Sequence, residues 1–189
     1  LSGEDTITKL GDRIPAEDRV VILLGGASAE RNGTRPAVRE ALNGRFSREF
    51  GGSEANPTFE TLMKAVELIR NEKLDFLLAV GGGSVIDGTK FVAAAVDFEG
   101  DPWSILTTHG ANVKAAMPLG TVMTLPATGS EMNSFSVITR HATREKLAFG
   151  SPHVFPRFSV LDPTRTYSLP VRQIANGVVD SFVHIMEQY

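Results

Sequence analysis

Two continuous apolar runs, separated by an amphipathic segment, dominate the first part of the chain. Residues 20–24 and 76–80 are rich in leucine and β-branched side chains, and each run is followed at once by glycines. Runs of this length are typical of strands that are buried on both faces of a parallel sheet. Between them, residues 57–71 carry apolar side chains at steps of three and four, which predicts a helix.

The alternation of strand and helix patterns continues beyond the second run. Residues 84–96 predict another helix, and residues 117–124 predict a further strand. Residues 135–139 and 147–149 are separated by polar residues and predict a hairpin, while residues 158–161 predict one more strand. This order implies an α/β fold with a right-handed, doubly wound and mostly parallel sheet.

The period of the pattern changes near residue 168. Apolar side chains then recur on one face of a helix, with Ser168 or Pro170 as its start signal. The stripe consists of Val171, Ile174, Val178, Phe182 and Ile185. We therefore expect an α/β domain over residues 1–167 and the start of a second, helical domain over residues 168–189. Because the chain begins without methionine and stops within this pattern, we expect it to be a fragment.

Composition and charge narrow the classes of protein. The chain has 189 residues, 42% of them hydrophobic, with 19 basic and 22 acidic side chains and no cysteine. A chain of this length buries roughly two thirds of its unfolded surface, so it needs no disulfides, and thiolate zinc sites are excluded. Scattered basic residues disfavour a nucleic-acid surface, and no apolar run approaches the roughly 18 residues of a membrane helix. We expect a cytoplasmic protein with neither nucleic-acid nor membrane partners.

The sharpest motif is Gly81-Gly82-Gly83-Ser84, between a predicted strand and a predicted helix. Glycines let the backbone approach an anion, and a helix amino terminus offers N–H groups and partial positive charge to a pyrophosphate. The alternative is a tight turn that needs positive φ and binds nothing. Three successive glycines exceed what a turn requires, which favours binding. The motif lacks the spacing of G-x-G-x-x-G and the Gly-Lys-Ser/Thr of a Walker loop, which disfavours a kinase or NTPase.

A second glycine pair follows the first strand. Gly25, Gly26 and Ser28 lie at a strand end where open α/β sheets bind ligands. No acidic side chain stands here to bind a ribose 2′-hydroxyl, and small residues with Arg31 nearby leave room for a 2′-phosphate. The alternative is a flexible loop without a ligand.

Hydroxyl groups gather in the segment from Thr124 to Glu131. Its Thr-Gly-Ser turn can hydrogen-bond phosphates or the carboxamide of a nicotinamide. Taken alone, Ser130 is equally well explained as the cap of a helix.

A possible metal pair lies in the last helix. Asp180 and His184 are four residues apart, so their side chains share one helix face and can reach the same cation. As an isolated pair they are more often a solvated or salt-bridged couple. His109, His141 and His153 lie in segments without convergent spacing, and we interpret them as surface or loop histidines.

Together, these motifs resemble the iron-containing (group III) alcohol dehydrogenase family, and most closely its branch of NADPH-dependent aldehyde reductases and butanol dehydrogenases. The resemblance covers essentially the whole chain. It rests on Asn56-Pro57, on residues 81–84 with Asp87 and Lys90, on residues 124–131, on Leu161-Asp162-Pro163, and on residues 176–180 followed by His184. It implies a Rossmann-like, dehydroquinate-synthase-like dinucleotide-binding domain, then an all-helical domain with a metal in the cleft between them. This chain resembles the first domain and the opening helix of the second.

The resemblance also implies a set of site residues. Its cofactor-contacting positions fall on Gly25, Gly26, Ser28, Asn56, Gly82, Gly83, Ser84, Thr124, Thr128, Asn133, Lys146 and Leu161. Gly26 stands where NAD-preferring relatives carry aspartate, which implies NADP(H). Asp180 and His184 match the first two of four metal ligands, and the other two are histidines that the family places further downstream than this chain reaches.

The implied reaction is reversible hydride transfer between NADP(H) and a small primary alcohol or aldehyde, in a homodimer. A divalent metal, Fe²⁺ or Zn²⁺, binds the substrate oxygen as a Lewis acid. No residue is identifiable as a general acid or base. Asp87 and Lys90, three apart on a helix, either line the inner cleft or form a helix-surface ion pair.

Two alternatives stay open. A glycerol dehydrogenase of the same superfamily shares the glycine loop, as does dehydroquinate synthase, although residues 128–131 and the pair Asp180 and His184 speak against the latter. The other alternative is a nucleotide-binding fragment without activity of its own.

Overall fold

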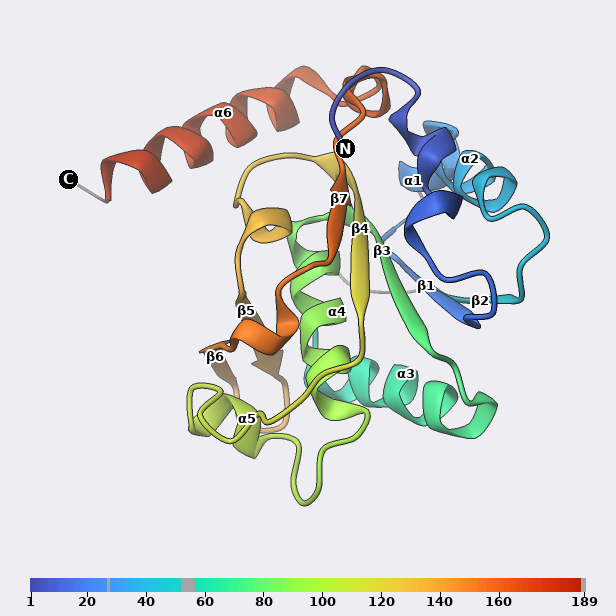
Figure 1. Ribbon diagram of the computed structural model, residues 1–189. Helices are drawn as coiled ribbons and strands as arrows, with labels where there is room; N and C mark the ends of the chain where they lie inside the picture. The colour runs from blue at the N-terminus through green and yellow to red at the C-terminus, as the bar shows by residue number, and fades with distance from the viewer. Residues whose placement is uncertain (27, 52–56, 188–189) are drawn as a thin grey trace.

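A parallel sheet forms the centre of the molecule (Figure 1). In residues 1–26, 28–51 and 57–187, which the computed structural model describes, this sheet has five strands in the order β2-β1-β3-β4-β7. They are β1 (Val20–Leu24), β2 (Ser47–Phe50), β3 (Phe76–Gly82), β4 (Leu119–Leu125) and β7 (Phe158–Val160), all mutually parallel. Strand order reverses between β1 and β3, which makes their carboxyl ends the expected place for a ligand.

Helices and a hairpin surround the sheet. The helices are α1 (Ser28–Arg31), α2 (Thr34–Ala41), α3 (Phe59–Glu72), α4 (Gly83–Ala95), α5 (Ser104–Thr107) and α6 (Val171–Met186). β5 (Phe135–Arg140) and β6 (Glu145–Gly150) pair as an antiparallel hairpin. Short 3₁₀ turns are η1 (Thr6–Lys9), η2 (Gly11–Arg13), η3 (Ser130–Met132), η4 (Pro152–Val154) and η5 (Pro163–Thr166).

The central strands are buried on both faces. Because side chains alternate along a strand, neighbouring residues of β1 and β3 enter different cores. Val21, Leu23, Leu77 and Ala79 pack with α3 and α4, whereas Val20, Ile22, Phe76 and Leu78 pack with η1 and α2. Covering both faces explains why these strands are continuous apolar runs in the sequence. The predicted doubly wound α/β fold is confirmed.

Most predicted elements are confirmed, and the missed ones are short or polar. β3 runs on to Gly82 because Gly81 and Gly82 still pair with β4. β2 was not predicted, since it is an edge strand that carries Arg48 and Glu49 in its middle. α2 was missed because its residues include Pro36 and several charged side chains, and α1 and α5 have only four residues each.

α6 projects from the top of the sheet (Figure 1). It begins at Val171, directly after Pro170, as predicted, but Gly177 is the one buried position among its described residues. Its predicted apolar stripe is exposed, with Val178 65% and Phe182 61% accessible. The stripe borders a groove of about 750 Å³ beside the carboxyl end of β4. A domain boundary between residues 167 and 168 stays a prediction. None of the helices in the described residues is long and apolar enough to cross a bilayer.

The aromatic contacts of α4 are expected to contribute strongly to the stability of the fold. Phe91 is fully buried, with its ring centroid 5.7 Å from Phe59 and 6.5 Å from Phe149. Phe91→Ala is expected to lower the free energy of unfolding in urea by about 3–5 kcal/mol, because it leaves a cavity between α3 and the hairpin. The matched variant Phe155→Ala, at a side chain that is 46% exposed, should cost less than about 1 kcal/mol. Equal losses would contradict this assignment of the core.

Candidate cofactor site

The glycine turn brings α4 close to two strand ends at once. A Cβ on Gly81 would lie 2.9 Å from Cβ of Val85, and a Cβ on Gly25 would lie 3.0 Å from Val85 Cγ2. Val85, in the first turn of α4, therefore occupies the space that side chains after β1 and β3 would need. This close approach at the switch point explains why both positions are glycine.

The turn does not use left-handed backbone. Gly82 is the N-cap of α4 with φ −89° and ψ −172°, and the positive-φ glycines of the described chain lie elsewhere. The alternative interpretation, a tight turn that needs positive φ, is therefore wrong in its backbone geometry. A Cβ on Gly83 would collide with the side chain of Thr128, which follows β4. Gly81 and Gly83 thus serve close packing, whereas a Cβ on Gly82 would lie 3.5 Å from Cβ of Leu125, an ordinary contact distance. Gly82, as the N-cap, leaves the amino end of α4 without a side-chain cap. Such an end suits an anion.

The segment after β4 borders this helix end. Gly82 pairs with Leu125 at the end of β4. Of the two threonines here, Thr124 is buried, with 4% of its surface accessible, whereas Thr128 is exposed. Ser130 N donates to Thr128 Oγ1 at 3.3 Å. Ser130 lies inside η3, whose N-cap is Gly129 and makes no side-chain cap bond, so the interpretation of Ser130 as a helix cap is wrong.

Lys90 is buried rather than exposed to a cleft or to solvent. Its exposed fraction is 0%, so neither the cleft-lining nor the surface ion-pair interpretation holds for it. Nζ donates to Ser130 O at 2.6 Å, Ser130 Oγ at 2.9 Å, Asn133 Oδ1 at 2.9 Å and Phe135 O at 2.8 Å. The carboxamide oxygen of Asn133, a predicted cofactor contact, is therefore already an acceptor for Lys90.

Ser130 links Lys90 to Asp87. Ser130 Oγ donates to Asp87 Oδ1 at 2.6 Å and accepts from Lys90, while Val137 N donates to Asp87 Oδ2 at 3.1 Å. Burial raises the pKa of Asp87 and lowers the pKa of Lys90 to about 8. Both groups belong to a buried polar network that joins α4 to the segment after β4 and to β5.

A separate hollow of about 410 Å³ lies at the end of β1. It is lined by Leu24, Gly25, Gly26, Ala29, Glu30, Arg35, Glu49 and Gly51. A Cβ on Gly26 would have no atom within 4 Å, so the position next to this hollow is open. Arg31 is exposed at the end of α1 and is not among the described lining residues. The arginine of the hollow is Arg35.

Arg35 and Glu49 are the residues that sequence reasoning missed. Arg35 Nη2 lies 2.5 Å from Glu49 Oε2 and Arg39 Nε lies 2.7 Å from Glu49 Oε1, while Arg35 also pairs with Glu30 at 2.8 Å. The hydrogen bond from Arg35 lowers the pKa of Glu49. Because β2 was not predicted, there was no reason to expect Glu49 next to Gly25 and Gly26 at the end of β1.

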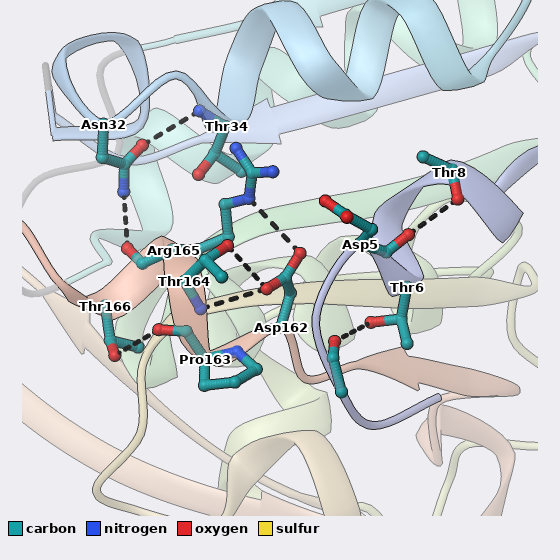
Figure 2. A network of polar contacts seen from close by, with 11 residues as sticks. Asp5, Thr6, Thr8, Asn32, Thr34, Asp162, Pro163, Thr164, Arg165 and Thr166 are labelled. Atoms are coloured by element: carbon teal, nitrogen blue, oxygen red, sulfur yellow. Dashed lines mark hydrogen bonds and ion pairs between the residues drawn. The ribbon is translucent and has the colours of Figure 1, made fainter.

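The Leu161-Asp162-Pro163 motif anchors the chain after β7 (Figure 2). Asp162 is 2% exposed and accepts hydrogen bonds from Thr164 N at 3.0 Å and Thr164 Oγ1 at 2.7 Å. Although burial opposes it, these bonds and Arg165 hold the pKa of Asp162 below its usual value. Asn32 Nδ2 donates to Arg165 O at 3.0 Å and so ties η5 to the turn between α1 and α2.

Asp180 and His184 share one face of α6, as their spacing predicts, in a geometry that suits a metal pair and a salt-bridged couple alike. Asp180 Oδ2 lies 3.8 Å from His184 Nε2, with side chains 45% and 49% exposed. Ser181 Oγ donates to Ala127 O at 3.2 Å, which places this turn of α6 beside the segment after β4. No group of three His, Cys, Asp or Glu side chains suited to a metal occurs among the described residues.

The other predicted contacts are more scattered. Ser28 begins α1, and Ser84 is half-buried at the start of α4. Lys146 is exposed on β6, and Leu161 is half-buried with its N–H bonded to Leu1 O at 2.8 Å. Asn56 lies outside the described residues. The structure thus gathers the glycine turns, Ser84, Thr124 and Thr128 at the strand ends, and the cofactor roles of all twelve positions stay predictions.

Comparison with known proteins assigns the family. The family model of iron-containing alcohol dehydrogenases matches residues 1–163. The chain therefore belongs to the iron-containing alcohol dehydrogenase family, and the expected resemblance is confirmed.

Individual relatives agree with this assignment. The chain is 56% identical over 191 residues to the NADPH-dependent aldehyde reductase YqhD of Escherichia coli, covering 100% of this chain and 49% of the relative. It is 46% identical over 192 residues to the probable NADH-dependent butanol dehydrogenase 1 of Bacillus subtilis, with the same coverage of 100% and 49%. A solved structure of Escherichia coli YqhD matches with a TM-score of 0.98 at 55% identity, over 100% of this chain and 49% of that one. The chain spans about half the length of these relatives.

The glycine turn supports a prediction about packing. Gly81→Ala is expected to lower the free energy of unfolding by about 1–3 kcal/mol, because the new methyl group meets the rigid, buried Val85. Gly51→Ala, where a Cβ meets nothing within 4 Å, should change stability by less than about 1 kcal/mol. Urea unfolding of both variants measures the difference, and a stable Gly81→Ala variant would show that α4 does not need the close approach.

Proposed function

We propose that this chain forms the cofactor-binding half of a metal-dependent alcohol dehydrogenase or aldehyde reductase. The enzyme transfers a hydride between NADP(H) and a primary alcohol or aldehyde. The observation that carries the proposal is the uncapped amino end of α4, set between the glycine ends of β1 and β3 at the switch point of the sheet. Membership of the family supports the same reaction class.

The described residues suit a dinucleotide. The first N–H groups of α4 favour a pyrophosphate, and glycines at positions 82 and 83 let its oxygens reach the backbone. We place the adenosine part of the dinucleotide in the hollow beside Gly26. The segment around Thr128 contacts the amino end of α4 at Gly83 and so borders the rest of the cofactor. When bound, the nicotinamide carries the hydride and the metal polarises the substrate oxygen.

Asp180 and His184 fit a divalent metal by chemistry. A carboxylate oxygen and an imidazole nitrogen, one helical turn apart, suit iron or zinc. The family is named for iron, and a carboxylate with an imidazole suits zinc equally well. Two protein ligands do not complete a catalytic site, so further ligands would come from outside the described residues.

The preference for NADP(H) rests on this chain's own residues. The aldehyde reductase of Escherichia coli is named for NADPH and the butanol dehydrogenase of Bacillus subtilis for NADH, so family membership alone does not decide between the two cofactors. Gly26 presents no carboxylate, and the two carboxylates among the described lining residues of the hollow, Glu30 and Glu49, are both paired with Arg35. Both features favour a 2′-phosphate over a bare ribose hydroxyl. The expectations of a homodimer, a cytoplasmic location and no nucleic-acid or membrane partner stay predictions.

Cofactor choice is testable by substitution at Gly26. We expect NADPH to bind more tightly than NADH, and Gly26→Asp to lower the NADPH-to-NADH affinity ratio at least about tenfold, because it sets a negative charge against the 2′-phosphate. Titration of nicotinamide fluorescence measures both affinities. Thr107→Asp, which adds the same charge at an exposed position of α5, should leave the ratio unchanged. An equal or reversed preference in the unaltered protein would refute the choice of NADP(H).

Binding and catalysis should separate in the 189-residue chain. Supplied with Fe²⁺ or Zn²⁺, NADPH and short aldehydes, this chain is expected to bind the cofactor without turnover, because its described residues bring together two metal ligands, Asp180 and His184, where a catalytic site needs at least three. The Escherichia coli aldehyde reductase, assayed in parallel, is the positive control. Turnover within tenfold of that enzyme would mean that the chain finds its other ligands in His109, His141, His153 or a second copy.

A further inference from the structure

The ammonium of Lys90 is the polar centre of the segment after β4. Within the described chain it donates to four oxygens, all from residues 130–135, at 2.6–2.9 Å. The side chain reaches these oxygens from the second turn of α4, which starts at the glycine turn. One buried side chain thus joins the helix whose amino end suits the pyrophosphate to the segment that carries Thr128 and Asn133.

We propose that Lys90 is a positioning residue for the cofactor: its ammonium holds residues 128–135 against α4 in the arrangement that NADPH binds. The proposal rests on the proposed function, since it assumes that the cofactor lies over the amino end of α4. Lys90 itself is fully buried, so in this role it acts through residues 128–135 rather than by contact with the cofactor.

The hydrogen-bond chemistry favours the charged form in this role. All four partners of Nζ are acceptors, and an ammonium has three N–H donors whereas a neutral amine has two and a lone pair. Asn133 Oδ1 also accepts from Phe135 N at 2.9 Å, so the same oxygen fixes the turn toward β5. Loss of the proton would leave these buried oxygens short of donors, which costs free energy and loosens the segment.

The surroundings make that proton titratable near neutral pH. Burial lowers the pKa of Lys90 to about 8, and the carboxylates of Asp87 on α4 and Glu131 on η3 oppose this shift. Among the charged residues of the hairpin strands, Arg140, Glu145 and Lys146, it is Lys146 whose charge lowers the pKa of Asp87. With a pKa of about 8, the Lys90 side chain is mostly charged at pH 7 and mostly neutral at pH 9. If the charged form binds the cofactor, affinity falls as pH rises through about 8.

The experiment is a pH profile of NADPH affinity, measured by nicotinamide fluorescence between pH 7 and 9.5. The unaltered protein should bind about tenfold more weakly at pH 9 than at pH 7, in proportion to the charged fraction of Lys90. Lys90→Met should bind at least about tenfold more weakly at pH 7 and show no decline with pH. Lys64→Met, at an exposed lysine of α3, should follow the unaltered protein. Circular dichroism checks that each protein is folded across the range.

Ser130→Ala keeps the lysine and removes one acceptor, so it tests the network even where Lys90→Met fails to fold. Its decline in affinity should move to lower pH, because the ammonium loses a partner. A flat profile in the unaltered protein, or a decline that survives in Lys90→Met, would overturn the role of Lys90 and leave the proposed function intact. Absence of NADPH binding at pH 7 would instead overturn the proposed function.

Discussion

The close approach of α4 to the sheet is the constraint on which the rest of the structure depends. Val85 fills the space beside Gly25 and Gly81, so the helix can lie against the ends of β1 and β3 at once. A side chain at either glycine would push the helix away from the switch point. The same approach fixes where the amino end of α4 points, and it does so through packing rather than through unusual backbone angles.

α4 combines an apolar and a polar task along one short helix. Phe91 packs between α3 and the hairpin, while Asp87 and Lys90 form hydrogen bonds with the segment after β4 and with β5. Burying these charges is costly, and hydrogen bonds to Ser130, Asn133 and backbone groups offset the cost. In the proposed role of Lys90, this network orders residues 130–135, which border the proposed position of the cofactor.

Sequence reasoning succeeded where one local pattern determines the outcome. β1, β3, α3 and α4 carry strong apolar periodicity, and Asp180 and His184 are one helical turn apart whatever surrounds them. It failed where distant segments meet. Lys90 resembles a helix-surface residue until residues 130–135 cover it, and Glu49 gains its place only through the pairing of a polar edge strand with β1. The packing reason for Gly81 and Gly83 likewise required the positions of Val85 and Thr128 in three dimensions.

The central claim is that a dinucleotide binds across the amino end of α4 and the segment after β4. Backbone hydrogen exchange, followed by mass spectrometry with and without saturating NADPH, tests it most directly. The account predicts slower exchange in residues 81–86 and 124–135 and no change in residues 104–116 around α5. Unchanged exchange in residues 81–86, with protection appearing only elsewhere in the chain, would contradict it.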